Sequence, residues 1–363
     1  MQGKQKIALL NLPVDNNYGG HLQRYALVTI LQRMGYDVTH LNVRFPSAQR
    51  SAAKYALGWV KRLLMYPYYW ITKSPKYKSF RYIRYYLQGE PITEAFYEKY
   101  IPHTSRIYNQ EELKQYQDFD GYIVGSDQVW RKKYMPFFGD DYGVWFLNFA
   151  ADKLCIAYGA SLGTDEQEFS PIEQERIRPL YNKFRAVSVR ENSALDILQE
   201  YGWTEPKAET VIDPTFMLTA NDYLNLIKCS KTEPLQNKLL CYVLDMNDDK
   251  WHTIEQIAKE NNIEPHVQTL DKNTNTSVEQ WLRNFSEAEY VITDSYHGVV
   301  FSLIFHKPFK LIMNESRGKT RFEGIEHQLH IHLQEPIDRN KLDCQIEKAW
   351  EHAKEFLIKA LHH

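Results

Sequence analysis

The chain has 363 residues, of which 43% are hydrophobic and 25% are charged, and its net charge is −2. These values are typical of globular proteins and exclude a disordered or fibrous chain, while the length predicts two domains. The near-neutral charge gives no general attraction to nucleic acid, so we expect no nucleic-acid partner. The four cysteines lack the spacing of a metal site, and no apolar run reaches the roughly 18 residues of a membrane helix. We therefore expect a cytoplasmic protein without a bound metal.

The first part of the chain alternates between strand and helix patterns. Lys6–Leu12 is an apolar run typical of a buried strand, Asn16–Gly35 has a helical period, and Asp37–Val43 predicts a second strand. Such units favour a parallel sheet, and we assign residues 1–225 to a first domain. Its further elements are strands at Gly121–Gly125, Leu154–Tyr158, Ala186–Val189 and Thr210–Ile212 and a helix at Ser193–Tyr201.

A polar, helix-breaking segment, Cys229–Asn237, predicts a linker to a second domain at residues 238–333. The same alternation resumes there, and Lys341–Leu361 then predicts a long final helix. The second domain's predicted strands are Leu239–Leu244, 265–270, Tyr290–Thr293 and Phe309–Met313, with helices at 249–261, 277–288 and 298–305.

Residues 44–110 interrupt this rhythm and predict an insertion. No acidic residue occurs from Val38 through Gly89, a stretch that contains ten basic and twelve aromatic residues. Apolar side chains mixed with cations are typical of helices at membrane surfaces, so residues 44–89 predict peripheral contact with an anionic membrane. There are two alternatives to membrane contact: the aromatic rings pack on the first domain, or sugars stack on them.

Two motifs in the first domain follow predicted strands. Asn17, Tyr18, Gly19 and Gln23 belong to NNYGGHLQ, whose glycines and helix N-terminus suit an anion. Ser126-Asp127 follows the strand of GYIVG, at the sheet edge where ligands collect. A simple connecting turn and a helix-capping Asp127 are the alternatives.

Three further motifs carry charged or titratable side chains. Arg190 leaves a strand end and could bind a phosphate or carboxylate, or pair with Glu191 on the surface. In TDSYHG, Asp294, Ser295 and His297 stand where a strand meets a helix, and His297 is suited to proton transfer unless it only caps the helix. The segment 314–322 holds Arg317, Lys319 and Arg321, which predict either an anion-binding loop or a solvated basic loop.

In this order and spacing, the motifs resemble the polysaccharide pyruvyl transferase family. The resemblance runs from about residue 7 to 325 and omits the insertion and the final helix. The matching segments are NNYGGHLQRYAL, GYIVGSDQVW, SVRENSALDIL, VIDPTFML, TDSYHGVVFSLIFHKPF and RGKTRF.

The resemblance implies an α/β fold of two Rossmann-like domains facing across a cleft, as in B-type glycosyltransferases, with helix 341–361 packing back on the first domain. It implies phosphoenolpyruvate as co-substrate, no other cofactor, and a sugar or lipid-linked glycan as acceptor, on which pyruvate forms a ketal. His297 then matches the general acid, and Arg190 matches an arginine that binds the donor. We assign Asn17, Tyr18, Gly19, Ser295, Arg317 and Arg321 to the donor as well, and Gln23, Ser126, Asp127 and Asp294 to the cleft and acceptor.

The chain departs from the family in one place. Family members typically carry Arg-Leu before the histidine, whereas Ser295-Tyr296 stand there in this chain. Arg317 or Arg321 is expected to replace the missing cation from the neighbouring loop. The alternative functions are a glycosyltransferase that uses a nucleotide-activated sugar and a non-catalytic glycan-binding protein of the same fold.

Overall fold

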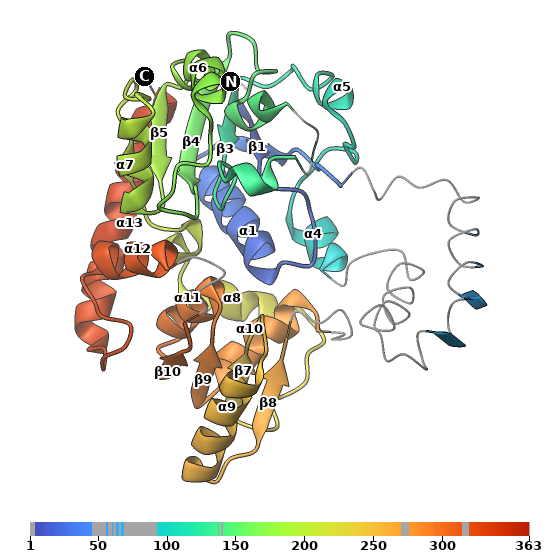
Figure 1. Cartoon of the computed structure of the whole chain (residues 1–363), viewed down its shortest axis with the longest axis vertical. Helices are drawn as coiled ribbons and strands as arrows, with labels where there is room; N and C mark the ends of the chain where they lie inside the picture. Colours follow the sequence, from blue (N-terminus) through green and yellow to red (C-terminus); the bar gives the residue numbers. More distant parts are fainter. Residues whose placement is uncertain are drawn as a thin grey trace.

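The chain contains two parallel β-sheets, one at each end of the long axis of the molecule, and helices pack around both (Figure 1). The structure is a computed structural model. It describes residues 4–45, 93–136, 138, 141–269, 276–313 and 319–362, and a few isolated positions between 56 and 68.

The first sheet has six strands in the described part of the chain, in the order β2-β1-β3-β4-β5-β6. Every neighbouring pair is parallel. All four residues of β3 are buried, as expected of a central strand covered on both faces, which is why this strand reads as an unbroken apolar run. The strands are β1 Lys6–Leu10, β2 Asp37–His40, β3 Gly121–Val124, β4 Leu154–Ala160, β5 Ala186–Val189 and β6 Glu209–Thr210.

The second sheet has four strands among the described residues, in the order β10-β9-β7-β8, and its neighbouring pairs are also parallel. β7 is fully buried at its centre. The strands are β7 Leu239–Tyr242, β8 Pro265–Gln268, β9 Tyr290–Thr293 and β10 Phe309–Leu311.

Side-chain caps mark the start of several helices. Asn17 accepts a hydrogen bond from the backbone N–H of Gly20, and Ser295 accepts one from Gly298. None of the described helices is both long enough and apolar enough to span a membrane. The helices are α1 Tyr18–Arg33, α4 Glu94–Tyr100, α5 Gln110–Leu113, α6 Pro171–Tyr181, α7 Asn192–Glu200, α8 Ala220–Lys228, α9 Asp248–Asn261, α10 Val278–Glu287, α11 Tyr296–Ile304, α12 Thr320–Leu329 and α13 Arg339–His362, with 3-10 helices η3 Lys132–Tyr134, η4 Tyr142–Phe146 and η5 Pro214–Met217.

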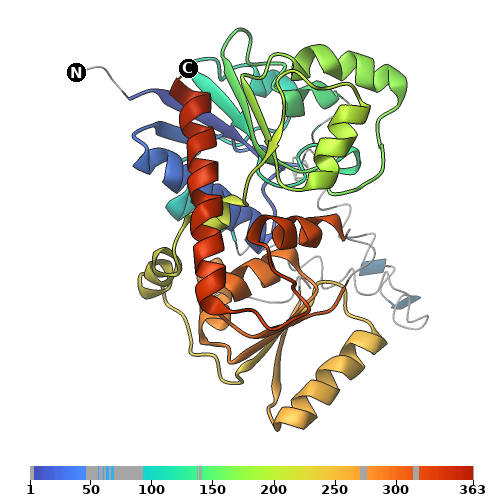
Figure 2. The same cartoon turned by 90° about the vertical axis from the view of Figure 1, so that its left-hand side faces the viewer.

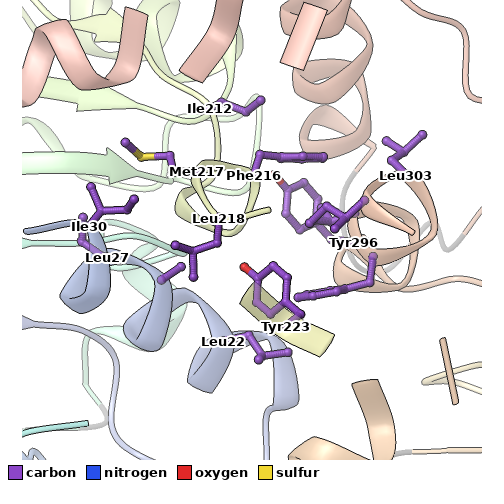
Figure 3. Close-up of a cluster of buried hydrophobic side chains, with 14 of the residues drawn as sticks. Leu22, Leu27, Ile30, Ile212, Phe216, Met217, Leu218, Tyr223, Tyr296 and Leu303 are labelled. Atoms are coloured by element: carbon purple, nitrogen blue, oxygen red, sulfur yellow. The ribbon is translucent and has the colours of Figure 1, made fainter. Parts of the chain in front are cut away.

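One hydrophobic cluster is shared by the two halves of the molecule. Figure 3 shows its centre, where side chains from α1, η5, α8 and α11 interdigitate. Because these helices belong to different sheets, burial of their apolar faces against each other stabilises the junction between the sheets. The labelled members are Leu22, Leu27, Ile30, Ile212, Phe216, Met217, Leu218, Tyr223, Tyr296 and Leu303.

The last helix, α13, runs from the second half of the molecule back along the first (Figure 2). The indole N–H of Trp350 donates to the carbonyl oxygen of Met217 at 3.0 Å, and Nε2 of His352 lies 3.1 Å from the carbonyl oxygen of Thr210. α12 packs on both α13 and α7, so the C-terminal segment holds the two halves together.

The structure differs from the sequence expectations in two segments. Residues 314–322 were expected to form a loop, but α12 begins at Thr320, so Arg321 lies in a first helical turn. The end of the expected insertion belongs to the first sheet's edge, because His103 pairs with His40 and Ile107 with Val43 in isolated parallel bridges. Nearly all of residues 46–92 lies outside the described residues, so the predicted membrane contact stays a prediction.

Candidate active site

Segments that follow β3, β5 and β6 meet the N-termini of α1 and α11 at the junction of the two sheets. Parallel strands present their carboxyl ends at one edge, which explains how side chains far apart in sequence come together. The group consists of Gln23 on α1, Asp127 after β3, Arg190 after β5, Asp213 after β6 and His297 on α11.

The carboxylate of Asp213 is the centre of this group, and it is buried. Its Oδ2 accepts hydrogen bonds from Nε2 of Gln23 at 2.6 Å and from Nη1 of Arg190 at 3.0 Å. Its Oδ1 accepts from the backbone N–H and the hydroxyl of Thr215, at 3.1 and 2.7 Å. These four bonds fix the carboxylate in one position.

Asp213 was not among the residues that the sequence assigned to the site. It stands in the segment VIDPTFML, just beyond a short strand, where an acid followed by proline predicts a turn as readily as a functional group. Its position at a strand end was the available signal.

Arg190 is buried with only 1% of its side chain exposed. Besides its bond to Asp213, its Nη2 donates to Oδ1 of Asp127 at 3.3 Å. Burial works to lower the pKa of Arg190, but the nearby acidic groups of Tyr296, Asp127 and Asp213 raise it, so the guanidinium stays charged. The bonds to Asp213 and Asp127 use only two of the five N–H groups of the guanidinium. Its Nε lies 3.9 Å from Oε2 of Glu191 and has no hydrogen-bond partner among the described residues.

The Ser126-Asp127 segment is held in an uncommon backbone conformation. Asp127 has φ of 80°, in the left-handed region that residues with a side chain seldom adopt. The hydroxyl of Ser126 donates to the carbonyl oxygen of Gly159 at 3.2 Å and accepts from Nε2 of Gln23 at 3.3 Å. Burial works to raise the pKa of Asp127, but the charge of Arg190 holds it below its usual value. Asp127 is therefore a carboxylate at neutral pH.

His297 lies in the first turn of α11, with 7% of its surface exposed. Its Nε2 is 4.0 Å from Oδ2 of Asp213 and has no hydrogen-bond partner among the described residues. Burial lowers the pKa of His297 to about 4, Arg190 adds to this effect, and Asp213 and Asp127 oppose it. The imidazole is therefore neutral at pH 7 when no anion is bound.

The N-terminus of α1 touches His297 directly. A Cβ atom at position 19 would clash with the imidazole, because Nδ1, Cγ and Cε1 of His297 all lie within reach of it. Gly19 is therefore needed for this close approach rather than for an unusual backbone angle. The contact joins the two halves of the molecule at the histidine.

Two arginines lie near the ring of Tyr296. The guanidinium carbon of Arg190 is 4.4 Å from the centre of the Tyr296 ring, and that of Arg321 is 5.7 Å from it. The rings of Tyr296 and His297 are 5.1 Å apart and nearly perpendicular. Burial, and then the charge of Arg190, lower the pKa of Arg321. Arg321 thus reaches the site from α12, whereas Arg317 lies outside the described residues.

The remaining predicted site residues have structural contacts. Asn17 caps α1, and Ser295 caps α11. The hydroxyl of Tyr18 donates to the carbonyl oxygen of Thr276 at 2.8 Å, and its ring stacks on Trp281 at 5.7 Å. Tyr18 therefore links α1 to the segment leading into α10.

Asp294 lies at the edge of the second sheet, in a group separate from Asp213. Its Oδ2 accepts from Nζ of Lys250 at 2.6 Å, and its Oδ1 accepts from the backbone N–H of Leu244 at 2.7 Å. These bonds tie β9 to the end of β7. Within the described residues, no cluster of His, Cys, Asp and Glu is arranged to hold a metal ion.

Comparisons with known proteins bear on the fold and the family. A family model described as polysaccharide pyruvyl transferase matches residues 17–316, well over half of the chain. The chain is similar to the structure of UDP-N-acetylglucosamine 2-epimerase from Rickettsia bellii, with a TM-score of 0.50 and 10% identity, covering 99% of this chain and 97% of that one. It is also similar to UDP-GlcNAc 2-epimerase from Methanocaldococcus jannaschii, with a TM-score of 0.46, 10% identity and coverage of 96% and 92%. No curated protein matches the sequence significantly.

At such low identity, the likeness to the Rickettsia bellii enzyme bears on the fold alone. Together with the two parallel sheets, it confirms the expected α/β class of two Rossmann-like domains in the B-type glycosyltransferase architecture. The expected family is also confirmed.

Proposed function

Because the chain belongs to the polysaccharide pyruvyl transferase family, a family of transferases, we propose that it transfers the pyruvyl group of phosphoenolpyruvate to a sugar. The acceptor is a cell-surface polysaccharide or its lipid-linked precursor. The observation that carries this proposal is the buried His297, whose Nε2 lies 4.0 Å from Asp213 and whose ring touches Gly19 of the other domain.

The reaction needs one proton donor and no change of oxidation state. A proton adds to the methylene carbon of phosphoenolpyruvate and makes the neighbouring carbon electrophilic. One sugar hydroxyl forms a C–O bond to that carbon, the C–O bond to phosphate breaks, and a second hydroxyl then closes the ketal. The two hydroxyl protons leave, one restoring the acid and one going to the released phosphate.

His297 is the proposed general acid. The negative charge of bound phosphoenolpyruvate is proposed to raise its pKa, so that the imidazole takes up a proton. Burial keeps its pKa at about 4 without a ligand. Phosphoenolpyruvate brings a phosphate and a carboxylate, and negative charge near the imidazole raises its pKa. Binding should therefore take up a proton, and affinity should fall as the pH rises through the pKa of His297 in the complex.

Arg321 is the proposed replacement for the arginine that family members carry two residues before the histidine. It approaches Tyr296 from α12, on the same ring that Arg190 contacts. Arg190 and Arg321 thus bring two cations to the same ring, and together they are the proposed oxyanion-binding pair.

Calorimetric titration with phosphoenolpyruvate in two buffers of different ionisation enthalpy tests the proposal. We expect the wild type to take up a proton on binding phosphoenolpyruvate and the His297→Gln variant to lose this proton uptake. The control is His327→Gln, which alters an exposed histidine on α12 and should take up a proton as the wild type does. Titrations with UDP, UDP-sugars and GDP-sugars run beside it. Binding of a nucleotide sugar without binding of phosphoenolpyruvate would replace this proposal with a glycosyltransferase.

A further inference from the structure

Arg24 on α1 is a buried cation without an ion pair among the described residues. It is 3% exposed, and its Nη2 donates to the carbonyl oxygen of Leu12 at 2.6 Å. Its Nε and Nη1 are buried and have no hydrogen-bond partner in the described part of the chain. Buried charges in folded proteins are normally paired, because an unpaired one keeps the full cost of leaving water. The guanidinium therefore has no ion-pair partner and two unbonded N–H positions among the described residues.

The side chain of Arg24 leans toward the N-terminus of its own helix, as helical side chains do. A Cβ atom at Gly20 would lie 3.3 Å from Nη1 of Arg24 and 3.4 Å from Nδ2 of Asn17. The guanidinium is thus aimed at the first turn of α1, beside the capping asparagine.

Positive charge gathers at this turn, and one carboxylate is present there, that of Asp15, whose Oδ1 accepts a hydrogen bond from the backbone N–H of Asn17 at 2.9 Å. A helix N-terminus carries partial positive charge, and the first turn of α1 contains no acidic residue. Burial lowers the pKa of Arg24, and Asp15 and Tyr97 oppose this from a distance without an ion pair among the described residues. The pKa of His21 is lowered to about 3 by burial, so its ring is neutral and supplies no charge of either sign.

We propose that Arg24 and the first turn of α1 bind an oxyanion of the substrate, either the phosphate or the carboxylate of the donor. This inference rests on the proposed function, because it names the residue that receives that donor's charged group. The subsite adjoins the histidine, since Gly19 touches His297 and the next residue, Gly20, faces Arg24. Asp127 interacts electrostatically with Arg24 and accepts a hydrogen bond from Arg190.

The test is calorimetric titration of the full chain with phosphoenolpyruvate, inorganic phosphate and pyruvate. The variant is Arg24→Gln, and the matched control is Arg33→Gln, which changes an arginine of the same helix that pairs with Asp222 and has 52% of its side chain exposed. We expect Arg24→Gln to bind phosphoenolpyruvate roughly 10-fold to 100-fold more weakly, the usual cost of losing hydrogen bonds to a charged group, and Arg33→Gln to match the wild type. Inorganic phosphate and pyruvate show which group of phosphoenolpyruvate Arg24 binds. If Arg24 binds the phosphate group, the variant loses binding of inorganic phosphate, and if it binds the carboxylate, the variant loses binding of pyruvate.

Folding of the variants is measured by thermal unfolding without any anion. If Arg24→Gln does not fold, Arg24→Lys replaces it. Lysine keeps the positive charge but lacks the planar guanidinium with its paired N–H donors, so phosphoenolpyruvate should bind more weakly to Arg24→Lys than to the wild type.

Each outcome separates this inference from the proposed function. Wild-type affinity for phosphoenolpyruvate in Arg24→Gln overturns the inference and leaves the proposed function standing. Binding of phosphate, but not of phosphoenolpyruvate, that depends on Arg24 supports the inference and overturns the proposed function. If the wild type binds none of the three anions, both are wrong.

Discussion

Replacing Asp213 with asparagine removes the negative charge at the centre of the site while keeping the shape of the side chain. Asp213 is buried and accepts hydrogen bonds from Gln23, Arg190 and Thr215. Removing one partner of a buried ion pair costs about 3–5 kcal/mol, because the other charge is left uncompensated. Arg190 keeps Asp127, so we expect the lower end, about 3 kcal/mol of the free energy of unfolding.

The matched control is Asp222→Asn, which also breaks an Arg–Asp pair, but one whose arginine, Arg33, is half exposed. Such a surface pair contributes about 1 kcal/mol or less. Urea unfolding followed by circular dichroism gives both values. Equal losses in the two variants would refute the view that the buried Asp213–Arg190 pair stabilises the fold more than the Asp222–Arg33 pair does.

Three further predictions follow from the same contacts. The free energy of unfolding should fall as the pH drops from 6.5 to about 4, by up to about 3 kcal/mol from His297, because its pKa is about 4 when folded and 6.5 when unfolded, so the unfolded chain binds the proton first. Urea unfolding at several pH values should show that the free energy of unfolding of His297→Gln depends less on pH than that of the wild type. The same pH dependence in both would assign the effect to other groups. Gly19→Ala should lower turnover and the melting temperature together, because the added methyl group meets the ring of His297, and a normal melting curve with normal activity would contradict that contact. The chain should float with liposomes that contain anionic lipid, and this binding should fall as salt rises and be lost when residues 50–86 are deleted. Absence of salt-sensitive flotation would contradict the predicted membrane contact.

The strands of both domains could be predicted from the sequence because buried parallel strands read as short apolar runs. β3 and β9 are examples, and each is followed within a few residues by a member of the site, Asp127 after β3 and His297 after β9. The position of His297 at a helix N-terminus could be predicted for the same reason, since Thr293 ends a strand and an apolar helix begins shortly after it.

The pairings of side chains could not be predicted in this way. Asp213 meets Gln23 across 190 residues of chain, and no local pattern carries that information. Asp294 could be placed at a strand end, but its bond to Lys250 depends on a helix whose approach only the folded chain defines, and its assignment to the acceptor stays a prediction. α12 was missed because three cations and a glycine near its start are typical of a loop.

The central claim is that this chain makes a pyruvyl ketal from phosphoenolpyruvate with His297 as the acid. The most direct measurement incubates the enzyme with phosphoenolpyruvate and glycans, and follows phosphate release together with the mass of the glycan product. We predict acceptor-dependent phosphate release and a pyruvylated glycan, with turnover roughly 10²-fold to 10⁴-fold lower in His297→Gln. A glycan modified only when a nucleotide sugar is supplied, or His297→Gln turning over at the wild-type rate, would contradict it.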